Sequence, residues 1–88
     1  MVTQTPNVEV TKDWTLVFTG ATVEFINVEV HGRDAFLRID TAIPTEDVGV
    51  RISEGYRAPN NKDVILGGGE NLYARGVDSD TTLVITGA

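Results

Sequence analysis

The feature of this sequence that most restricts its fold is a period of two in the apolar residues. Apolar side chains stand at every second position of segments 35–40 and 48–53, and in segment 81–86 Leu83 and Ile85 follow Thr81 with the same spacing. This period is that of a half-buried β-strand, whereas an amphipathic helix needs apolar residues about every 3.6 positions. Because no stretch carries the helical spacing over three turns, the sequence predicts an all-β protein.

Turn-forming residues divide the alternating runs into short segments. About eight short strands, with turn signals every 8–12 residues or so, are typical of an antiparallel β-sandwich or a jelly-roll-like barrel. One short helical turn is expected at residues 45–47, after Pro44. The expected turns are Thr19-Gly20, residues 31–34, Glu54-Gly55, residues 59–61, residues 67–69 and residues 78–80.

The longest run, from Thr22 to Val30, changes phase near Ile26. Val23 and Phe25 share one face, and Val28 and Val30 share the other. Such a change predicts a β-bulge or a bend, or a strand that leaves one sheet and joins another.

The chain of 88 residues is expected to form a single domain spanning residues 1–88. A domain this small buries only roughly 60–65% of the surface of its unfolded chain, so self-association is an expected source of further stability. Residues 1–7 are polar and form either a frayed tail or an extended arm that pairs with another subunit's sheet edge. The predicted core is Val10, Trp14, Leu16, Phe18, Val23, Phe25, Val28, Val30, Leu37, Ile39, Val48, Val50, Ile52, Val64, Leu66, Leu72, Ala74, Leu83 and Ile85.

Charge and composition exclude several classes of function. The formal net charge is −6 and the seven basic residues are scattered, which disfavours nucleic acid and anionic membranes as partners. The chain has no cysteine, so disulfides and cysteine-based zinc sites are excluded. The longest apolar runs have three residues, far short of the roughly 20 of a membrane-spanning helix. A soluble protein that begins at Met1, with no leader segment, is expected.

Residues that could support catalysis are few. The single histidine, His31, lies in a predicted turn, where solvent exposure is more usual than a role as proton shuttle or metal ligand. Neither Ser53 nor Ser79 lies in a nucleophile elbow. We therefore expect no enzyme activity and no catalytic residue.

Two other motifs also have simple structural interpretations. The segment Gly67–Glu70 resembles a phosphate-binding loop but lacks the following Lys-Ser/Thr, so it is interpreted as a hairpin loop with positive φ values. Residues 78–80 with Glu70 contain carboxylates suited to calcium, but the EF-hand pattern is incomplete and a solvated turn is favoured. The sequence predicts no metal and no cofactor.

The best candidate for a contact surface is segment 53–63, the longest stretch without a clear pattern. It contains tyrosine and arginine, which are enriched at interface hot spots. An ordinary sandwich connection is the alternative. A second candidate is the pair Tyr73 and Arg75, which share the face of their strand opposite Leu72 and Ala74. The predicted interface residues are Tyr56, Arg57, Asn60, Asn61, Tyr73 and Arg75.

The last quarter of the chain resembles a known group of proteins. Segment 72–76, a short polar turn and the β-branched segment 81–86 resemble the C-terminal hairpin of small β-sandwich proteins encoded in tailed-phage structural gene clusters. The preceding segment 63–70 fits as a strand that runs into a glycine turn.

The resemblance implies a structural protein of a bacteriophage virion. It would be a capsid decoration or cement protein, or the base of a head or tail fibre, and such proteins are often homotrimers. The implied partners are other copies of the chain and a major capsid protein or other virion protein. The implied location is the capsid surface, after synthesis in the host cytoplasm. The alternative is a carbohydrate- or ligand-binding module that stacks sugars on Trp14, Tyr56 and Tyr73.

Overall fold

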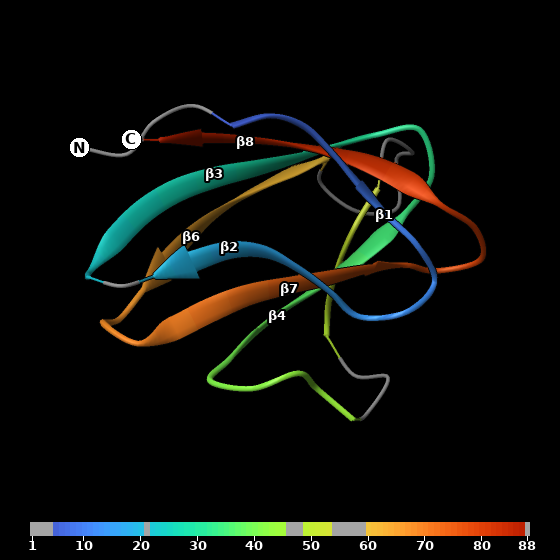
Figure 1. Cartoon of the computed structure of the whole chain (residues 1–88). Coiled ribbons are helices and arrows are strands. Elements are labelled where there is room, and N and C mark those ends of the chain that lie inside the picture. The colour runs from blue at the N-terminus through green and yellow to red at the C-terminus, as the bar shows by residue number, and fades with distance from the viewer. Residues whose placement is uncertain (1–4, 21, 46–48, 54–59, 88) are drawn as a thin grey trace.

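A computed structural model shows eight strands in two antiparallel sheets (Figure 1). The structure describes residues 5–20, 22–45, 49–53 and 60–87. Sheet A has the strand order β1-β8-β3-β6, and sheet B has the order β2-β7-β4-β5. The strands are β1 (Thr5–Val10), β2 (Thr15–Gly20), β3 (Glu24–His31), β4 (Ala35–Asp40), β5 (Val50–Ile52), β6 (Asn61–Leu66), β7 (Glu70–Gly76) and β8 (Thr81–Gly87).

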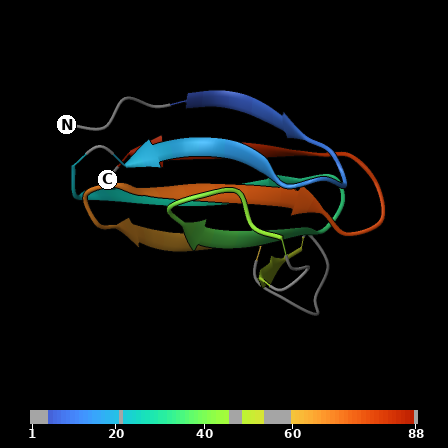
Figure 2. The ribbon, with the colours of Figure 1, turned by 60° about the horizontal axis from the view of Figure 1, so that its bottom comes forward.

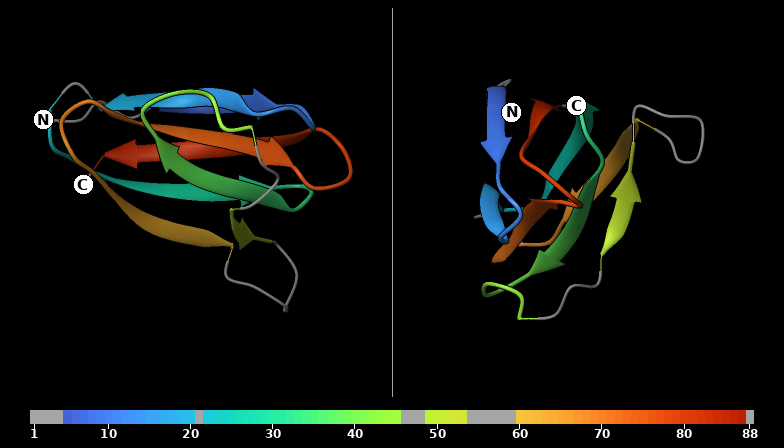
Figure 3. Two further views of the ribbon diagram at one scale, coloured as in Figure 1. Left: turned by 90° about the horizontal axis from the view of Figure 1, so that it is seen from below. Right: turned by 90° about the vertical axis from the view of Figure 1, so that its right-hand side faces the viewer.

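The strand pairing is that of a jelly roll. β1 pairs with β8, β2 with β7, β3 with β6, and β4 with β5, all antiparallel. The chain thus folds as a long antiparallel ribbon that wraps into two sheets packed face to face (Figure 3). The predicted all-β sandwich of jelly-roll type is confirmed.

The two sheets enclose an apolar core built from their inward-facing residues. Val10, Val28, Val30, Leu37 and ten other hydrophobic residues are buried. Five predicted core residues are wrong, since they are more than 40% exposed, and Trp14 and Phe18 are half-buried. Val48 lies outside the described residues. The five exposed residues are Leu16, Val23, Phe25, Ile39 and Val50, and the buried residues that the prediction omitted are Ile26, Ala35 and Tyr73.

Strand β3 is continuous, so the predicted bulge near Ile26 is wrong. β3 pairs with β6 from Glu24 to Glu29 and with β8 from Ile26 to His31, without a register shift. The inward face carries Ile26 in phase with the two following valines, so Phe25 falls on the outer face. Register shifts occur instead in β1 and β2.

The turn after β6 is an arch between the sheets, not the predicted hairpin. β6 belongs to sheet A and β7 to sheet B. Gly69 has a φ of 88°, as expected for this turn, and its N–H donates to the Gly20 carbonyl at 2.7 Å. β7 and β8 likewise lie in opposite sheets, so segment 72–86 is not a hairpin either.

Residues 41–45, which follow β4, fold over the outer face of sheet B (Figure 2). The view from below in Figure 3 shows the same arrangement. Pro44 in this segment is buried. An added Cβ at Gly49 would come within 3.1 Å of the Trp14 indole, which shows how closely Gly49 meets the sheet. The helical turn predicted at residues 45–47 falls largely outside the described residues.

The N-terminal strand belongs to the domain itself. Thr5 and Asn7 pair with Ile85 and Val84 of β8 in the same chain. The predicted arm therefore does not include residues 5–7, and residues 1–4 lie outside the described part of the chain.

Candidate functional site

The four predicted interface residues that the structure describes do not form one surface. Asn60 and Asn61 are exposed at the start of β6 in sheet A, whereas Tyr73 and Arg75 lie on β7 in sheet B. The alternation that put Tyr73 opposite Leu72 is correct, yet Tyr73 is only 5% exposed. Residues 41–45 cross this face of the sheet, so Tyr73 is not exposed there. Tyr56 and Arg57 lie outside the described residues.

Arg75 stabilises packing on the outer face of sheet B. Its guanidinium carbon lies 5.7 Å from the ring centre of Trp14 and 5.1 Å from that of Phe36. Both distances are within the range of a cation–π contact, which is about 6 Å. One face of Trp14 is thus occupied, and Tyr73 is buried and presents no exposed ring face for a sugar.

An exposed apolar patch lies instead on the outer face of sheet A. Phe25 on β3 and Ile65 on β6 are direct cross-strand partners, with 54% and 62% of their surfaces exposed. Val23, two residues before Phe25, is 59% exposed. We call Val23, Phe25 and Ile65 the sheet A patch. Single exposed apolar residues are common, but adjacent ones on an uncovered sheet mark a candidate contact surface.

Polar groups border the sheet A patch along the same two strands. The Asn27 Nδ2 donates to Asp63 Oδ1 at 2.9 Å and to Asn61 Oδ1 at 3.4 Å. Further along β3, His31 Nε2 and Glu29 Oε1 are 2.7 Å apart. The exposed position predicted for His31 is confirmed. An apolar centre beside polar groups is the usual layout of a protein–protein interface.

The sequence reasoning missed this patch because it assigned Val23 and Phe25 to the core. The strict alternation of Val28 and Val30, extended backwards, gives Ile26 as the inward residue. That phase was the available signal, since it makes Phe25 point outward.

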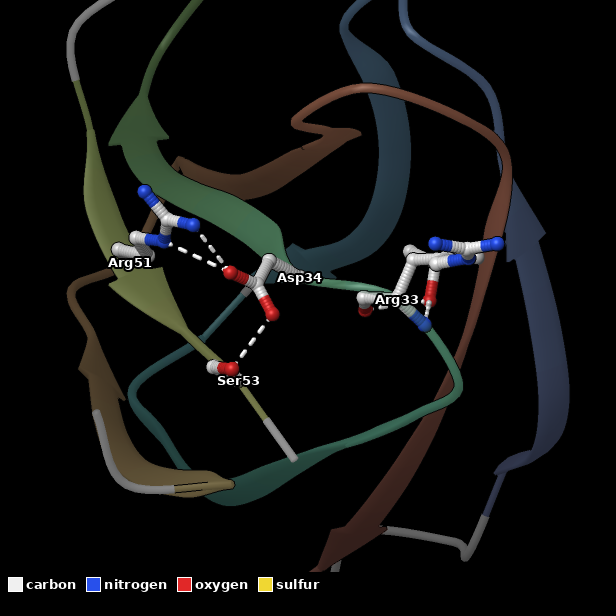
Figure 4. A network of polar contacts seen from close by, with 5 residues as sticks. Arg33, Asp34, Arg51 and Ser53 are labelled. Atoms are coloured by element: carbon white, nitrogen blue, oxygen red, sulfur yellow. Dashed lines mark hydrogen bonds and ion pairs between the residues drawn. The ribbon is translucent and has the colours of Figure 1, made fainter. Parts of the chain in front are cut away.

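A polar cluster lies where the β3–β4 turn meets β4 (Figure 4). It joins this turn to the end of β5 and to the start of β8. The Asp34 carboxylate accepts hydrogen bonds from Arg51 Nε at 2.9 Å, from Arg51 Nη2 and from Ser53 Oγ. The buried Thr81 hydroxyl accepts from the Arg33 N–H at 3.0 Å and donates to the Arg33 carbonyl at 2.7 Å. These contacts fix the turn to β5 and β8.

We expect the Asp34 cluster to contribute to stability. Asp34→Ala removes the acceptor of the 4%-exposed Ser53, so the free energy of unfolding should fall by about 1–3 kcal/mol. Arg51→Ala should lower it by less than about 1 kcal/mol, because this side chain is 49% exposed. Urea denaturation followed by circular dichroism measures both values. Equal losses would contradict the importance of the buried Ser53–Asp34 bond.

The remaining sequence candidates do not come together. Glu70 lies at the first residue of β7 and accepts from the Gly67 N–H at 2.6 Å, whereas residues 78–80 follow the other end of that strand. Within the described residues, no group of three or more His, Asp or Glu side chains is placed to hold a metal ion. In the same part of the chain, no helix is long and apolar enough to cross a membrane.

The fold and the sheet A patch define a small jelly-roll domain with an exposed apolar patch on sheet A. Comparisons of the chain with protein-family models, with curated proteins and with solved structures find no match.

Proposed function

We propose that this chain is a non-enzymatic structural protein that assembles with copies of itself, as a homotrimer, through the outer face of sheet A. The observation that carries the proposal is the sheet A patch, whose three members are each more than half exposed. Covering such side chains contributes roughly 1 kcal/mol or more apiece. A domain of 88 residues has a small core, so burial of this kind adds appreciably to its stability.

We further propose that the assembly decorates the capsid of a tailed phage, bound to a major capsid protein or serving as the base of a fibre. This step rests on the sequence resemblance of segments 63–70, 72–76 and 81–86 to phage structural proteins. The resemblance concerns the strand sequences alone, because segments 72–76 and 81–86 lie in opposite sheets and form no hairpin. The jelly roll, which is a frequent fold of viral capsid domains, is compatible with it. The acidic chain would suit a partner surface of positive charge.

The variant Phe25→Glu tests the assembly. It puts a charge at the centre of the patch, so the trimer should dissociate to monomers at micromolar concentration while the circular dichroism spectrum stays unchanged. Light scattering and native mass spectrometry measure the mass. Leu16→Glu is the matched control, because Leu16 is 49% exposed but lies on sheet B, and its trimer should persist.

Three outcomes would contradict parts of this proposal. A monomeric wild-type chain would contradict self-assembly. If the wild-type chain is a dimer and Phe25→Glu dissociates it, the patch is still the interface but the assembly is not a trimer. A two-fold dimer joins identical surfaces, whereas a ring of three joins two different surfaces. A trimer that Phe25→Glu leaves intact would exclude the patch as the interface.

A further inference from the structure

The shortness of β5 leaves a hollow between the two sheets, away from the sheet A patch. β5 pairs with β4 only from Ala35 to Leu37. Within the described residues, the second half of β4, from Arg38 to Asp40, therefore has no partner strand on that side. The hollow there has a volume of about 490 Å³. Small-molecule sites usually have volumes of roughly 300–1,000 Å³.

Both sheets contribute apolar side chains to the walls of this hollow. Leu37, Ile39, Val50 and Leu72 line it from sheet B, and Val64 lines it from sheet A. Ile39 is 41% exposed and Val50 is 48% exposed, although alternation directs both toward the core. The hollow thus offers uncovered apolar surface in a concave shape, which favours a ligand with an apolar tail.

Two cationic residues also line the hollow. Lys62 shares the inner face of β6 with Val64, and among the described residues it makes no ion pair. Arg38 also lines the hollow, but its Nε is already 3.6 Å from Asp40 Oδ2. Lys62 is therefore the cation available to a ligand, in a chain whose net charge is −6.

We propose that the hollow binds a free medium-chain alkyl carboxylate. The alkyl tail lies between the sheets against Ile39, Val50 and Val64, and the carboxylate accepts hydrogen bonds from the Lys62 ammonium group. An anionic head matches the lysine, and an apolar tail matches the walls. This site shares no residue with the sheet A patch, so the inference stands independently of the proposed function.

Decanoate and decanol, titrated into the ¹⁵N-labelled protein and followed by NMR, test the proposal. Decanoate should bind saturably and shift the amide signals of Ile39, Val50 and Val64. Octanoate, which is two methylenes shorter, should bind roughly tenfold more weakly. Val50→Trp fills the hollow and should abolish binding of both probes, while the spectrum stays dispersed.

Lys62→Glu isolates the contribution of the charge. Decanoate affinity should fall about tenfold or more, because a charge-assisted hydrogen bond is lost, while decanol affinity stays unchanged. Lys12→Glu is the matched control: it makes the same change of net charge at an exposed residue outside the hollow, and it should alter decanoate affinity much less.

Three results would overturn the proposal. The first is the absence of saturable binding. The second is a set of decanoate shifts centred on Phe25 and Ile65, which would indicate adsorption to the sheet A patch. The third is equal decanoate affinity of wild type and Lys62→Glu. In that case the lysine would serve as an inward-pointing charge that protects the edge strand β6 from pairing with other chains.

Discussion

Leu83→Ala should lower the free energy of unfolding by about 2–5 kcal/mol, the usual cost of a cavity in a packed core. Leu83 is fully buried on β8 and pairs with Val8 on one side and Val30 on the other. Small domains have total stabilities of roughly 5–15 kcal/mol, so this loss is a large part of the total and should raise the unfolded fraction by a factor of about 30 to several thousand. Urea denaturation, followed by the fluorescence of Trp14, measures the change.

Val84→Ala provides the matched control for Leu83→Ala. Val84 is the next residue along β8, faces outward and is half-buried. We expect a loss of less than about 1 kcal/mol, since little cavity forms at a partly exposed position. Similar losses for the two variants would contradict the assignment of inner and outer faces along β8, and with it the register of sheet A.

The segments that alternate without interruption were the ones whose inward-pointing faces the sequence predicted correctly. In β8, Leu83 and Ile85 are buried as expected. Segment 22–30 was ambiguous because it contains two overlapping apolar sets, one with Phe25 and one with Ile26. The phase of Val28 and Val30 favours the set with Ile26, and the pairing of β3 with two neighbouring strands fixes it. That pairing joins residues more than 30 positions apart.

The errors in sheet B arise because burial depends on segments that lie far away in the sequence. Tyr73 was correctly assigned to the outer face, but the alternation of β7 contains no information about residues 41–45, which fold over that face. Ile39 and Val50 were correctly assigned to the inner face, yet they remain exposed because β5 has only three residues. Alternation predicts which way a side chain points, whereas burial depends on what another segment brings to that side.

The topology was predicted only at the level of its class. Consecutive strands are neighbours in roughly two-thirds of cases, which made a hairpin the natural interpretation of segment 72–86. In this chain β7 and β8 belong to different sheets, because the ribbon that pairs β1 with β8 also pairs β2 with β7. The candidate surfaces depend on this arrangement. It brings Phe25 beside Ile65 in sheet A, and it sets Lys62 across from the open half of β4.

The link between β7 and β8 makes Gly76 another position where a small change should have a large effect. Gly76 is buried, and its N–H donates to the Thr11 carbonyl at 2.7 Å. A Cβ added at this residue would lie 1.8 Å from the carbonyl oxygen of Ser79 and 2.9 Å from its carbonyl carbon. These are backbone atoms of the connection that leads to sheet A, so they cannot move aside as a flexible side chain could.

We therefore expect Gly76→Ala to lower the free energy of unfolding by roughly 3 kcal/mol or more, at the upper end of the cost of overpacking. Gly69→Ala separates this steric effect from a conformational one. Gly69 has a φ of 88° and no atom within 4 Å of an added Cβ, so alanine there should cost only about 1–2 kcal/mol. Urea denaturation of both variants measures the difference. If Gly76→Ala cost no more than Gly69→Ala, residues 77–80 would be free to move away from β7. The close packing of Gly76 against the Ser79 backbone would then contribute little to the free energy of unfolding.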